Sequence, residues 1–339
     1  MPAVTAGSAP APTAVLAVDS GGSGLRAVLA AHGRDPLAPP ERLGAPLTSR
    51  EPVRTGRRGI DAAHLAAQLV PMARRLLAAA GADGIAAVAV GAAGLATLGD
   101  ELRADLPSAL ERELGVRRLA LVADAVTAYT GALGLRAGAV IAAGTGLIAV
   151  GTDLTRWRRA DGWGHLLGDC GGGAWIGRAG LEAAVRAFDG RRGGSAALLE
   201  RAEEMFGPVP GLPAQLYPRT DRPAALASFA PEVAACAAAD PVAAEILRSA
   251  AAHMAESAAA VCPDSDEARV ALTGGLFKMG EPLLGPLREE LAQQLPHARQ
   301  VPAAGDPLDG AVRIAADLAD DRLSLPRDER MLYVVTEKP

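Results

Sequence analysis

A glycine-rich turn between two apolar segments constrains the fold of this chain more than any other feature of its sequence. The flanking segments, residues 15–18 and 25–30, are apolar and of strand length, and Asp19 directly follows the first of them. Glycines in such a turn permit positive φ angles and leave no Cβ between the backbone N–H groups and an anion. We expect a phosphate to bind at Gly21-Gly22-Ser23, where the serine adds a hydroxyl donor. An ordinary hairpin turn without a ligand is the alternative.

A second turn of the same kind lies in the other half of the chain. Residues 138–143 and 147–151 read as apolar strands, and Gly144-Thr145-Gly146 joins them. Neither turn is a P-loop, since the chain contains no G-x-x-x-x-G-K-[ST], and neither opens a helix as a dinucleotide-binding motif does. Because the two halves of the chain each contain such a turn, we predict that the two turns bind the phosphates of one nucleotide across a cleft.

The composition predicts a two-domain protein that binds neither nucleic acid nor a membrane. A length of 339 residues corresponds to about two domains, and half of the residues are apolar. The net charge of −5 argues against a nucleic-acid surface. The most apolar stretch, residues 84–99, is short and broken by glycines, whereas a membrane span needs about 20 apolar residues.

The cysteine pattern and the first residues indicate the compartment. Three widely spaced cysteines without a C-x-x-C motif fit a reducing cytoplasm and no disulfide framework. They are Cys170, Cys236 and Cys262. Residues 1–13 are rich in proline and alanine and have no basic segment before an apolar core, so we expect a disordered lead-in and not a signal peptide. The predicted location is therefore the cytoplasm.

A carboxylate at the end of a buried strand is the candidate general base. Residues 119–123 are apolar, Asp124 follows them, and residues 125–135 have a helical pattern. Asp124 lies between the two glycine turns in the sequence, where a base that acts on a phosphate acceptor is needed. An N-cap of the following helix, worth about 1 kcal/mol, is the alternative.

Three further stretches carry chemistry. Residues 161–177 contain seven glycines, two tryptophans, a histidine and two aspartates, a composition typical of a functional loop. Residues 269–273 form a predicted strand that runs into Gly274-Gly275. The arginine-rich segment 34–58 contains Thr48-Ser49 and is expected to be mostly loop. It is either a solvated surface or the wall of a substrate pocket.

In their order along the chain, these motifs resemble the BadF/BadG/BcrA/BcrD ATPase family, in the N-acetylglucosamine kinase-like branch of the sugar kinase/Hsp70/actin superfamily. Asp19–Ser23 is similar to the D-G-G-G-T phosphate loop of the family, and Gly144-Thr145-Gly146 to its second phosphate loop, G-T-G-S. Residues 162–169 are similar to the signature G-G-W-G-H…G-D-E-G-S, the most specific of these matches. Leu272–Gly275 resembles the adenosine motif. The resemblance covers about residues 14–318.

The chain departs from the family pattern at several positions. Gly24 stands where the family often has lysine, and Cys170 and Gly172 replace the glutamate and the serine of G-D-E-G-S. The N-acetylglucosamine kinases hold the sugar with an asparagine that the corresponding loop lacks, and Thr48 or Ser49 is the expected substitute. These departures concern the identity of the sugar more than the handling of the nucleotide.

The resemblance implies an α/β fold of two ribonuclease-H-like (actin-like ATPase) domains around a central cleft. The expected domains are residues 14–122, which the last helix could rejoin, and residues 123–318. Residues 319–339 form a tail to which no function is assigned.

For the nucleotide, the resemblance implies ATP, bound mainly on the second domain with its adenosine at Gly274 and Gly275. Mg²⁺ is expected to bridge phosphate oxygens and to contact Asp19 through a water molecule. The residues expected to bind the phosphates are Gly21, Gly22, Ser23, Gly144, Thr145 and Gly146.

For the second substrate, the resemblance implies transfer of the γ-phosphoryl group to the 6-hydroxyl of N-acetylglucosamine or a close relative. Asp124, in Ala123-Asp124-Ala125, would be the general base. The residues expected to bind the sugar are Thr48, Ser49, Asp124, Gly164, His165 and Asp169. A homodimer is also implied.

Other functions remain compatible with these motifs. A kinase of glucosamine or another hexose would share the fold and differ in its sugar. An ATPase that activates a partner redox enzyme, as other members of the branch do, would hold an iron–sulfur cluster by cysteines, but the three cysteines form no recognisable cluster pattern. A sugar-binding regulator would carry a helix-turn-helix before the first strand, for which residues 1–13 leave no room. A hydrolase would need a motif such as G-x-S-x-G or H-E-x-x-H, which the sequence lacks.

Overall fold

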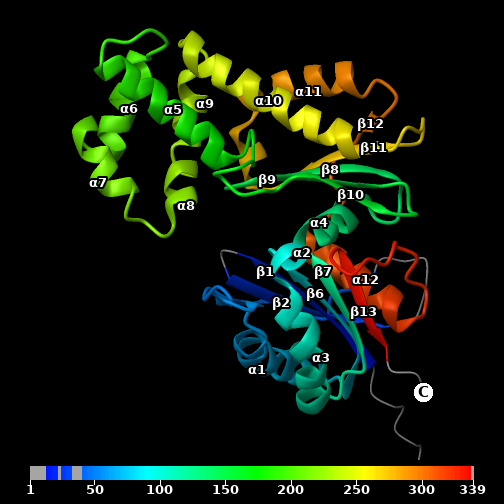
Figure 1. Ribbon diagram of the computed structural model, residues 1–339. Helices are drawn as coiled ribbons and strands as arrows, with labels where there is room; N and C mark the ends of the chain where they lie inside the picture. Colours follow the sequence, from blue (N-terminus) through cyan, green and yellow to red (C-terminus); the bar gives the residue numbers. More distant parts are fainter. Residues whose placement is uncertain (1–12, 22–23, 33–39, 337–339) are drawn as a thin grey trace, which may run out of the picture. The chain divides into compact units, whose positions relative to one another are not determined.

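The chain forms two compact units (Figure 1). The computed structural model describes residues 13–21, 24–32 and 40–336. Unit 1 consists of Met1–Leu135 and Ala304–Pro339, and unit 2 consists of Arg136–Ala303. Each unit contains one large β-sheet with helices packed against it, so the predicted α/β class is confirmed.

The division between the units follows two helices. Helix α4 (Asp124–Leu133) ends just before the first boundary, and α12 (Pro307–Ala319) begins just after the second. The two helices pack against each other, and α12 also packs against the sheet of unit 1. The first boundary of the units therefore lies after α4 and not after residue 122, whereas α12 lies in unit 1, as the prediction that the last helix could rejoin the first domain allowed.

Unit 1 contains a six-stranded sheet with the strand order β13-β7-β6-β1-β2-β3. Its strands are β1 (Thr13–Gly21), β2 (Gly24–Ala31), β3 (Leu47–Ser49), β6 (Gly84–Ala92), β7 (Arg118–Ala123) and β13 (Leu332–Thr336). Strands β1, β6 and β7 run parallel, while β2, β3 and β13 join antiparallel. The predicted first hairpin is confirmed as β1 and β2. Strand β13 comes from the segment predicted as a tail, and it completes one edge of the sheet.

Helices cover both faces of this sheet (Figure 1). On one face, α1 (Ala62–Ala80) and α3 (Asp100–Leu114) share a core with Leu16 and Val18 of β1. On the other face, α12 packs against β1 and β6. Since side chains alternate along a strand, Asp19 belongs to the face that α12 covers. The remaining elements of unit 1 are β4 (Thr55–Gly56), β5 (Gly59–Ile60) and α2 (Leu95–Leu98).

Unit 2 contains a five-stranded sheet with the order β10-β9-β8-β11-β12. Its strands are β8 (Gly138–Ala143), β9 (Leu147–Thr152), β10 (Trp157–Asp161), β11 (Arg269–Thr273) and β12 (Arg299–Gln300). Strands β8, β9 and β10 form an antiparallel meander, and β11 lies parallel to β8. The second predicted hairpin is thus confirmed as β8 and β9.

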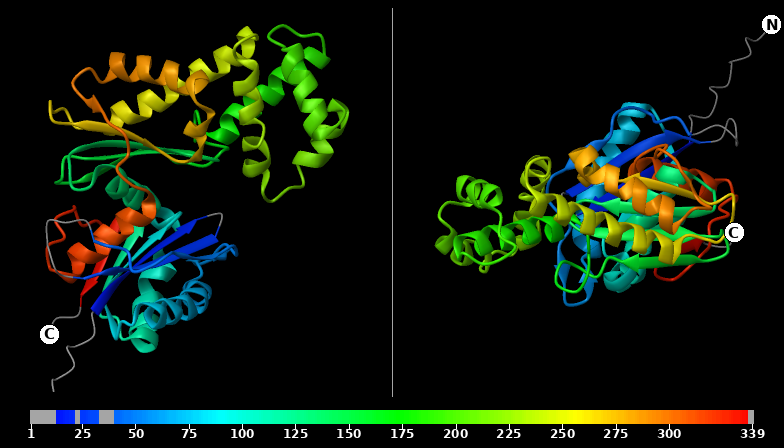
Figure 2. Two further views of the ribbon diagram at one scale, coloured as in Figure 1. Left: turned by 180° about the vertical axis from the view of Figure 1, so that it is seen from behind. Right: turned by 90° about the horizontal axis from the view of Figure 1, so that it is seen from above.

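The helices of unit 2 share one core with its sheet, and the left view of Figure 2 shows some of them along one face of the sheet and the others beside it. They are α5 (Gly173–Phe188), α6 (Ala196–Phe206), η1 (Val209–Gly211), α7 (Leu212–Leu216), α8 (Arg222–Ala227), α9 (Ala230–Cys236), α10 (Pro241–Val261), η2 (Gly275–Met279) and α11 (Glu281–Gln294). Alanine is the most frequent residue in this core, and small residues let helices approach closely. A Cβ at Gly177 of α5, for example, would lie 1.8 Å from the carbonyl oxygen of Leu226. In the parts of the chain that the structure covers, no helix is both long and apolar enough to cross a membrane.

Candidate functional site

The two carboxylates predicted to act on the nucleotide and its acceptor lie at the carboxyl ends of parallel strands in the sheet of unit 1. Asp19 pairs with Gly91 of the parallel strand β6, and Gly91 pairs with Val122 of β7. Asp124 comes directly after β7, at the carboxyl end of the same parallel strands. The carboxyl ends of parallel strands are where α/β sheets usually bind ligands. The strand order therefore brings Asp19 and Asp124 to the end of the sheet that is suited to ligand binding.

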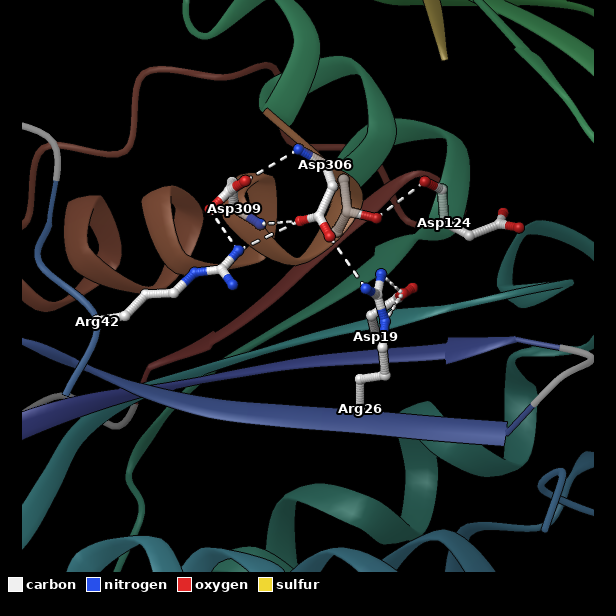
Figure 3. Close-up of polar contacts among 7 residues, drawn as sticks. Asp19, Arg26, Arg42, Asp124, Asp306 and Asp309 are labelled. Atoms are coloured by element: carbon white, nitrogen blue, oxygen red, sulfur yellow. Dashed lines mark hydrogen bonds and ion pairs between the residues drawn. The ribbon is translucent and has the colours of Figure 1, made fainter. Parts of the chain in front are cut away.

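Asp124 is the first residue of α4, and its environment is well defined. The N-cap of the helix is Ala123, so the N-cap interpretation of Asp124 is wrong. The Oδ1 of Asp124 accepts a hydrogen bond from the Ala125 N–H at 2.9 Å, and its carbonyl oxygen accepts one from the Thr127 hydroxyl at 2.8 Å. A negative charge in the first turn is also favoured by the helix dipole. Figure 3 shows the Asp124 carboxylate directed away from Asp19 and Arg26.

Asp19 takes part in a network of ion pairs that connects β1, β2 and the start of α12 (Figure 3). Its Oδ2 accepts hydrogen bonds from Arg26 Nη2 at 2.6 Å and Nε at 3.1 Å. The same guanidinium donates to Asp306 Oδ2 at 3.0 Å. Arg42 continues the network, because it pairs with both Asp306 and Asp309.

The acid at the start of α12 is held in its charged form. Asp306 is the N-cap of α12 and forms a capping box with Asp309. Burial acts to raise the pKa of Asp306, but the Asp309 N–H and the two neighbouring arginines outweigh burial, so the pKa is lowered. The network therefore ties the N-terminus of α12 to β2 with charged groups on both sides.

The first glycine turn is described in part. Gly21 pairs with Gly24 at the end of the hairpin, whereas Gly22 and Ser23, both predicted to bind phosphate, lie outside the described residues. Gly24 has a φ of 125°, and a Cβ there would lie 2.1 Å from the carbonyl oxygen of Ser49. No side chain fits at this position, which explains why the chain has glycine where the family often has lysine.

The predicted sugar-loop residues of unit 1 form the edge strand β3. Thr48 pairs with Arg26 of β2 and is exposed, while Ser49 is half-buried. The Ser49 hydroxyl donates a hydrogen bond to Gln68 Oε1 at 2.6 Å. Of the two, Thr48 therefore presents the more accessible hydroxyl.

The second glycine turn packs against the N-terminus of α5. The Gly173 N–H donates to the Gly144 carbonyl at 2.9 Å, and the Ala174 N–H donates to the Thr145 carbonyl at 2.8 Å. Gly144 and Thr145 are exposed. The positive end of the α5 dipole thus lies directly behind the turn, which favours an anion there.

The predicted adenosine turn lies beside this phosphate turn. A Cβ at Gly274 would be 2.1 Å from the carbonyl oxygen of Ala143, the last residue of β8. Gly275 has no atom within 4 Å of the position of its missing Cβ. Gly274 is therefore glycine for close packing, while Gly275 leaves open space.

Asp169 also contacts the second turn. A Cβ at Gly146 would lie 2.3 Å from Asp169 Oδ2, and Asp169 Oδ1 accepts a hydrogen bond from the Gly164 N–H at 3.0 Å. The pKa of Asp169 is raised, mainly by burial and also by the charge of Asp161. The hydrogen bond from the Gly164 N–H and the neighbouring His165 act to lower this pKa but do not outweigh the increase. Four predicted regions, the turn 144–146, Gly164, Asp169 and Gly274, are thus gathered in unit 2.

Asp161, which was not among the predicted site residues, contacts the backbone of the predicted site residue Asp169. Its Oδ1 accepts from the Asp169 N–H at 2.5 Å, and its Oδ2 accepts from the Cys170 N–H at 2.8 Å. The available signal was its position at the end of a strand and before a glycine-rich loop. The ion-pair network of unit 1 was also missed, although the D-P-L-D sequence at 306–309 is of the capping-box type.

The three cysteines are free, and in the parts of the chain described no group of three or more His, Cys, Asp or Glu residues could hold a metal ion. Burial raises the pKa of the Cys262 thiol to about 11. Cys170 and Cys236 are half-buried. The redox-activator alternative therefore gains no support from the geometry.

The chain belongs to the BadF/BadG/BcrA/BcrD ATPase family, whose sequence model matches residues 16–315. A curated relative, the N-acetylmuramic acid/N-acetylglucosamine kinase of Clostridium acetobutylicum, is 39% identical over 82 residues. The matched segment is 24% of this chain and 27% of that protein, so the chain covers little more than a quarter of that relative.

Solved structures with the same fold cover nearly the whole chain. A candidate N-acetylglucosamine kinase from Chromobacterium violaceum has a TM-score of 0.66 and 27% identity, over 89% of this chain and 99% of that one. A candidate N-acetylglucosamine kinase from Porphyromonas gingivalis has a TM-score of 0.66 and 18% identity, over 91% and 99%. A ROK family glucokinase from Streptomyces griseus, in complex with glucose and AMPPNP, has a TM-score of 0.53 and 23% identity, over 91% and 99%. The fold is thus the predicted two-domain, actin-like fold of the sugar kinases.

Proposed function

We propose that the protein is an ATP-dependent amino-sugar kinase, which transfers the γ-phosphoryl group of ATP to the 6-hydroxyl of N-acetylglucosamine or a close relative. The observation that carries the proposal is the contact between Asp169 and the turn 144–146 in unit 2. A carboxylate that can accept hydrogen bonds from sugar hydroxyls lies against a glycine turn of the phosphate-binding type. Membership of an ATPase family and the similarity to sugar-kinase folds support the same conclusion.

In this proposal, Asp124 is the general base. Its carboxylate accepts the proton of the attacking hydroxyl, while its backbone is held by the Thr127 hydroxyl and its Oδ1 by the Ala125 N–H. Phosphoryl transfer depends mostly on positioning and charge stabilisation, so a fixed carboxylate of this kind is sufficient. Asp169, Gly164 and His165 of unit 2, with Thr48 and Ser49 of unit 1, bind the sugar.

The proposed contacts to the nucleotide are backbone groups of the glycine turns. The turn 144–146 and residues 21–23 bind the phosphates, and the turn at Gly274-Gly275 binds the adenosine. Both hydrogen bonds from Arg26 go to Asp19 Oδ2, so Asp19 Oδ1 would be the oxygen that contacts a metal-bound water. Mg²⁺ that accompanies ATP would neutralise phosphate charge, and Asp19 would orient one of its waters.

The acceptor sugar is proposed at the level of the amino-sugar class. N-acetylglucosamine is the first candidate, and glucosamine or another hexose is the alternative. The curated relative is named for both N-acetylmuramic acid and N-acetylglucosamine, which favours including the acidic sugar in any test. We also propose a cytoplasmic homodimer, which light scattering on the purified protein would check.

A coupled ADP-release assay over a sugar panel tests the proposal. The panel comprises N-acetylglucosamine, N-acetylmuramic acid, N-acetylmannosamine, glucosamine and glucose. We expect sugar-dependent ADP release that is highest with an N-acetylated amino sugar and a product phosphorylated at the 6-hydroxyl by NMR. ADP release that is the same with and without every sugar would contradict the assignment.

A further inference from the structure

Asp161, the last residue of β10, joins the two ends of the glycine-rich loop that follows it. Its half-buried carboxylate accepts a hydrogen bond from the Asp169 N–H at 2.5 Å and another from the Cys170 N–H at 2.8 Å. Both oxygens are therefore used, and both bind backbone donors at the far end of the loop.

Backbone hydrogen bonds also hold the loop locally: the Gly168 N–H donates to the Gly164 carbonyl at 2.8 Å, and the Gly172 N–H donates to the Asp169 carbonyl at 2.9 Å. The side chains of Trp163, Leu166 and Leu167 are 64%, 76% and 85% exposed, so they contribute little burial. Glycines at 162, 164 and 168 increase the conformational entropy that the loop loses when it is ordered. Arg159 lies over the ring of Trp163 at 4.4 Å, which fixes only the start of the loop. At the end of the loop, the backbone N–H groups of residues 169 and 170 are bound by the Asp161 carboxylate.

The residue that Asp161 holds is Asp169. Asp169 has a φ of 55°, in the left-handed region that aspartate adopts more readily than most residues other than glycine. In this conformation its side chain reaches both the Gly164 N–H and Gly146. Gly168 allows the approach, because a Cβ there would lie 2.3 Å from Asp161 Oδ1.

Two departures from the family signature meet at this point. Asp161 stands where G-G-W-G-H has its first glycine, and Cys170 stands where G-D-E-G-S has glutamate. The Cys170 N–H donates directly to Asp161 Oδ2. Two positions at which this chain departs from the signature are thus hydrogen-bonded to each other.

We propose that Asp161 is a positioning residue for sugar binding: its carboxylate fixes the backbone of Asp169 so that the Asp169 side chain faces the sugar beside the turn 144–146. The inference rests on the proposed sugar kinase function. Asp161 itself does not touch the sugar.

The test compares Asp161→Asn with Asp153→Asn. Asparagine preserves the size of the side chain, but its NH₂ group can only donate. It would therefore face one of the two backbone N–H groups that a carboxylate oxygen accepts from in the wild type. We expect the KM for N-acetylglucosamine to rise about tenfold or more, with the KM for ATP and the kcat changed by less than about threefold. Asp153, before the other end of β10, also accepts bonds from two backbone N–H groups, those of Thr155 and Arg156. Asp153→Asn should leave all three constants unchanged.

Hydrogen–deuterium exchange at residues 169 and 170 gives a readout that does not depend on the sugar. We expect faster exchange in Asp161→Asn than in wild type, and no change in Asp153→Asn. If the wild type phosphorylates an amino sugar and Asp161→Asn keeps its KM, the inference is wrong while the proposed function stands. If the wild type phosphorylates no sugar of the panel, the proposed function fails. Exchange that is unchanged in Asp161→Asn then overturns the positioning role as well.

Discussion

Asp169 lies against Gly146 so closely that a Cβ at Gly146 would come within 2.3 Å of the Asp169 Oδ2. The side chain predicted to hold the sugar and the turn predicted to hold phosphate are thus in contact within unit 2. A kinase must bring an alcohol and a phosphate together, and small errors in this geometry are costly. This contact is therefore the natural place for a steric test.

Gly146→Ala should displace Asp169, because the added methyl group would occupy the space of Oδ2. We expect kcat/KM for the amino sugar to fall about 10- to 100-fold, with the folded state retained. Steady-state kinetics with varied sugar would measure the change. Gly285→Ala in α11, where the nearest atom is Glu281 Oε2 at 3.8 Å, is the matched control. Equal kinetics for Gly146→Ala and wild type would show that the contact has no role.

Gly310→Ala should destabilise unit 1, since a Cβ at Gly310 would lie 1.9 Å from the carbonyl oxygen of Thr127 in α4. The two helices would have to separate, at a cost of about 1–3 kcal/mol in the free energy of unfolding. Gly131→Ala in α4 should behave alike, because its Cβ would lie 2.0 Å from the Asp306 carbonyl oxygen. Urea unfolding followed by circular dichroism would measure both. Unchanged midpoints would mean that the helices do not cross as described.

Arg26→Gln should leave the carboxylates of Asp19 and Asp306 without a shared cation. The Arg26 side chain is 37% exposed, so solvent screens its ion pairs. We therefore expect a loss of about 1 kcal/mol in the free energy of unfolding. The double variant Arg26→Gln/Asp306→Asn should recover part of it, because asparagine remains a good N-cap for α12. The difference between wild type and Arg26→Gln should shrink in high salt. A loss that does not depend on salt would speak against an ion-pair origin.

The KM for the sugar should depend on pH through Asp169. Burial, together with the charge of Asp161, raises the pKa of Asp169 despite the opposing Gly164 N–H and His165. A protonated carboxyl is a poorer hydroxyl acceptor, so KM should rise as the pH falls through this raised pKa, at a higher pH than for an ordinary aspartate. In Asp161→Asn the rise should move to lower pH, because a like charge is removed. A KM for the sugar that is flat with pH would contradict this role.

Much of the fold could be predicted because its signals are local. The two hairpins followed from apolar segments joined by glycine-rich turns. The second turn and Asp169, which are in contact, both belong to motifs that the sequence had singled out. These features depend on residues that are close in the sequence or belong to a recognisable motif.

The rest depends on pairs that are distant in the sequence. Arg26 and Asp306 are 280 positions apart, and neither residue alone indicates the other. The close crossing of α4 and α12 likewise depends on Gly131 and Gly310, which are ordinary glycines in the sequence. Asp161 was missed for a different reason: its partners are backbone N–H groups, so the only signal was its position at the end of a strand and before a glycine-rich loop.

The kinetics of Asp124→Asn test the central claim most directly. The substitution keeps the size of the side chain and removes the proton acceptor, so kcat should fall about 10²- to 10⁴-fold. Nucleotide affinity, measured by calorimetry with a non-hydrolysable ATP analogue, should stay within about threefold of wild type, and Asp153→Asn should keep full activity. Near-native turnover by Asp124→Asn, with the same sugar and the same product, would contradict the account.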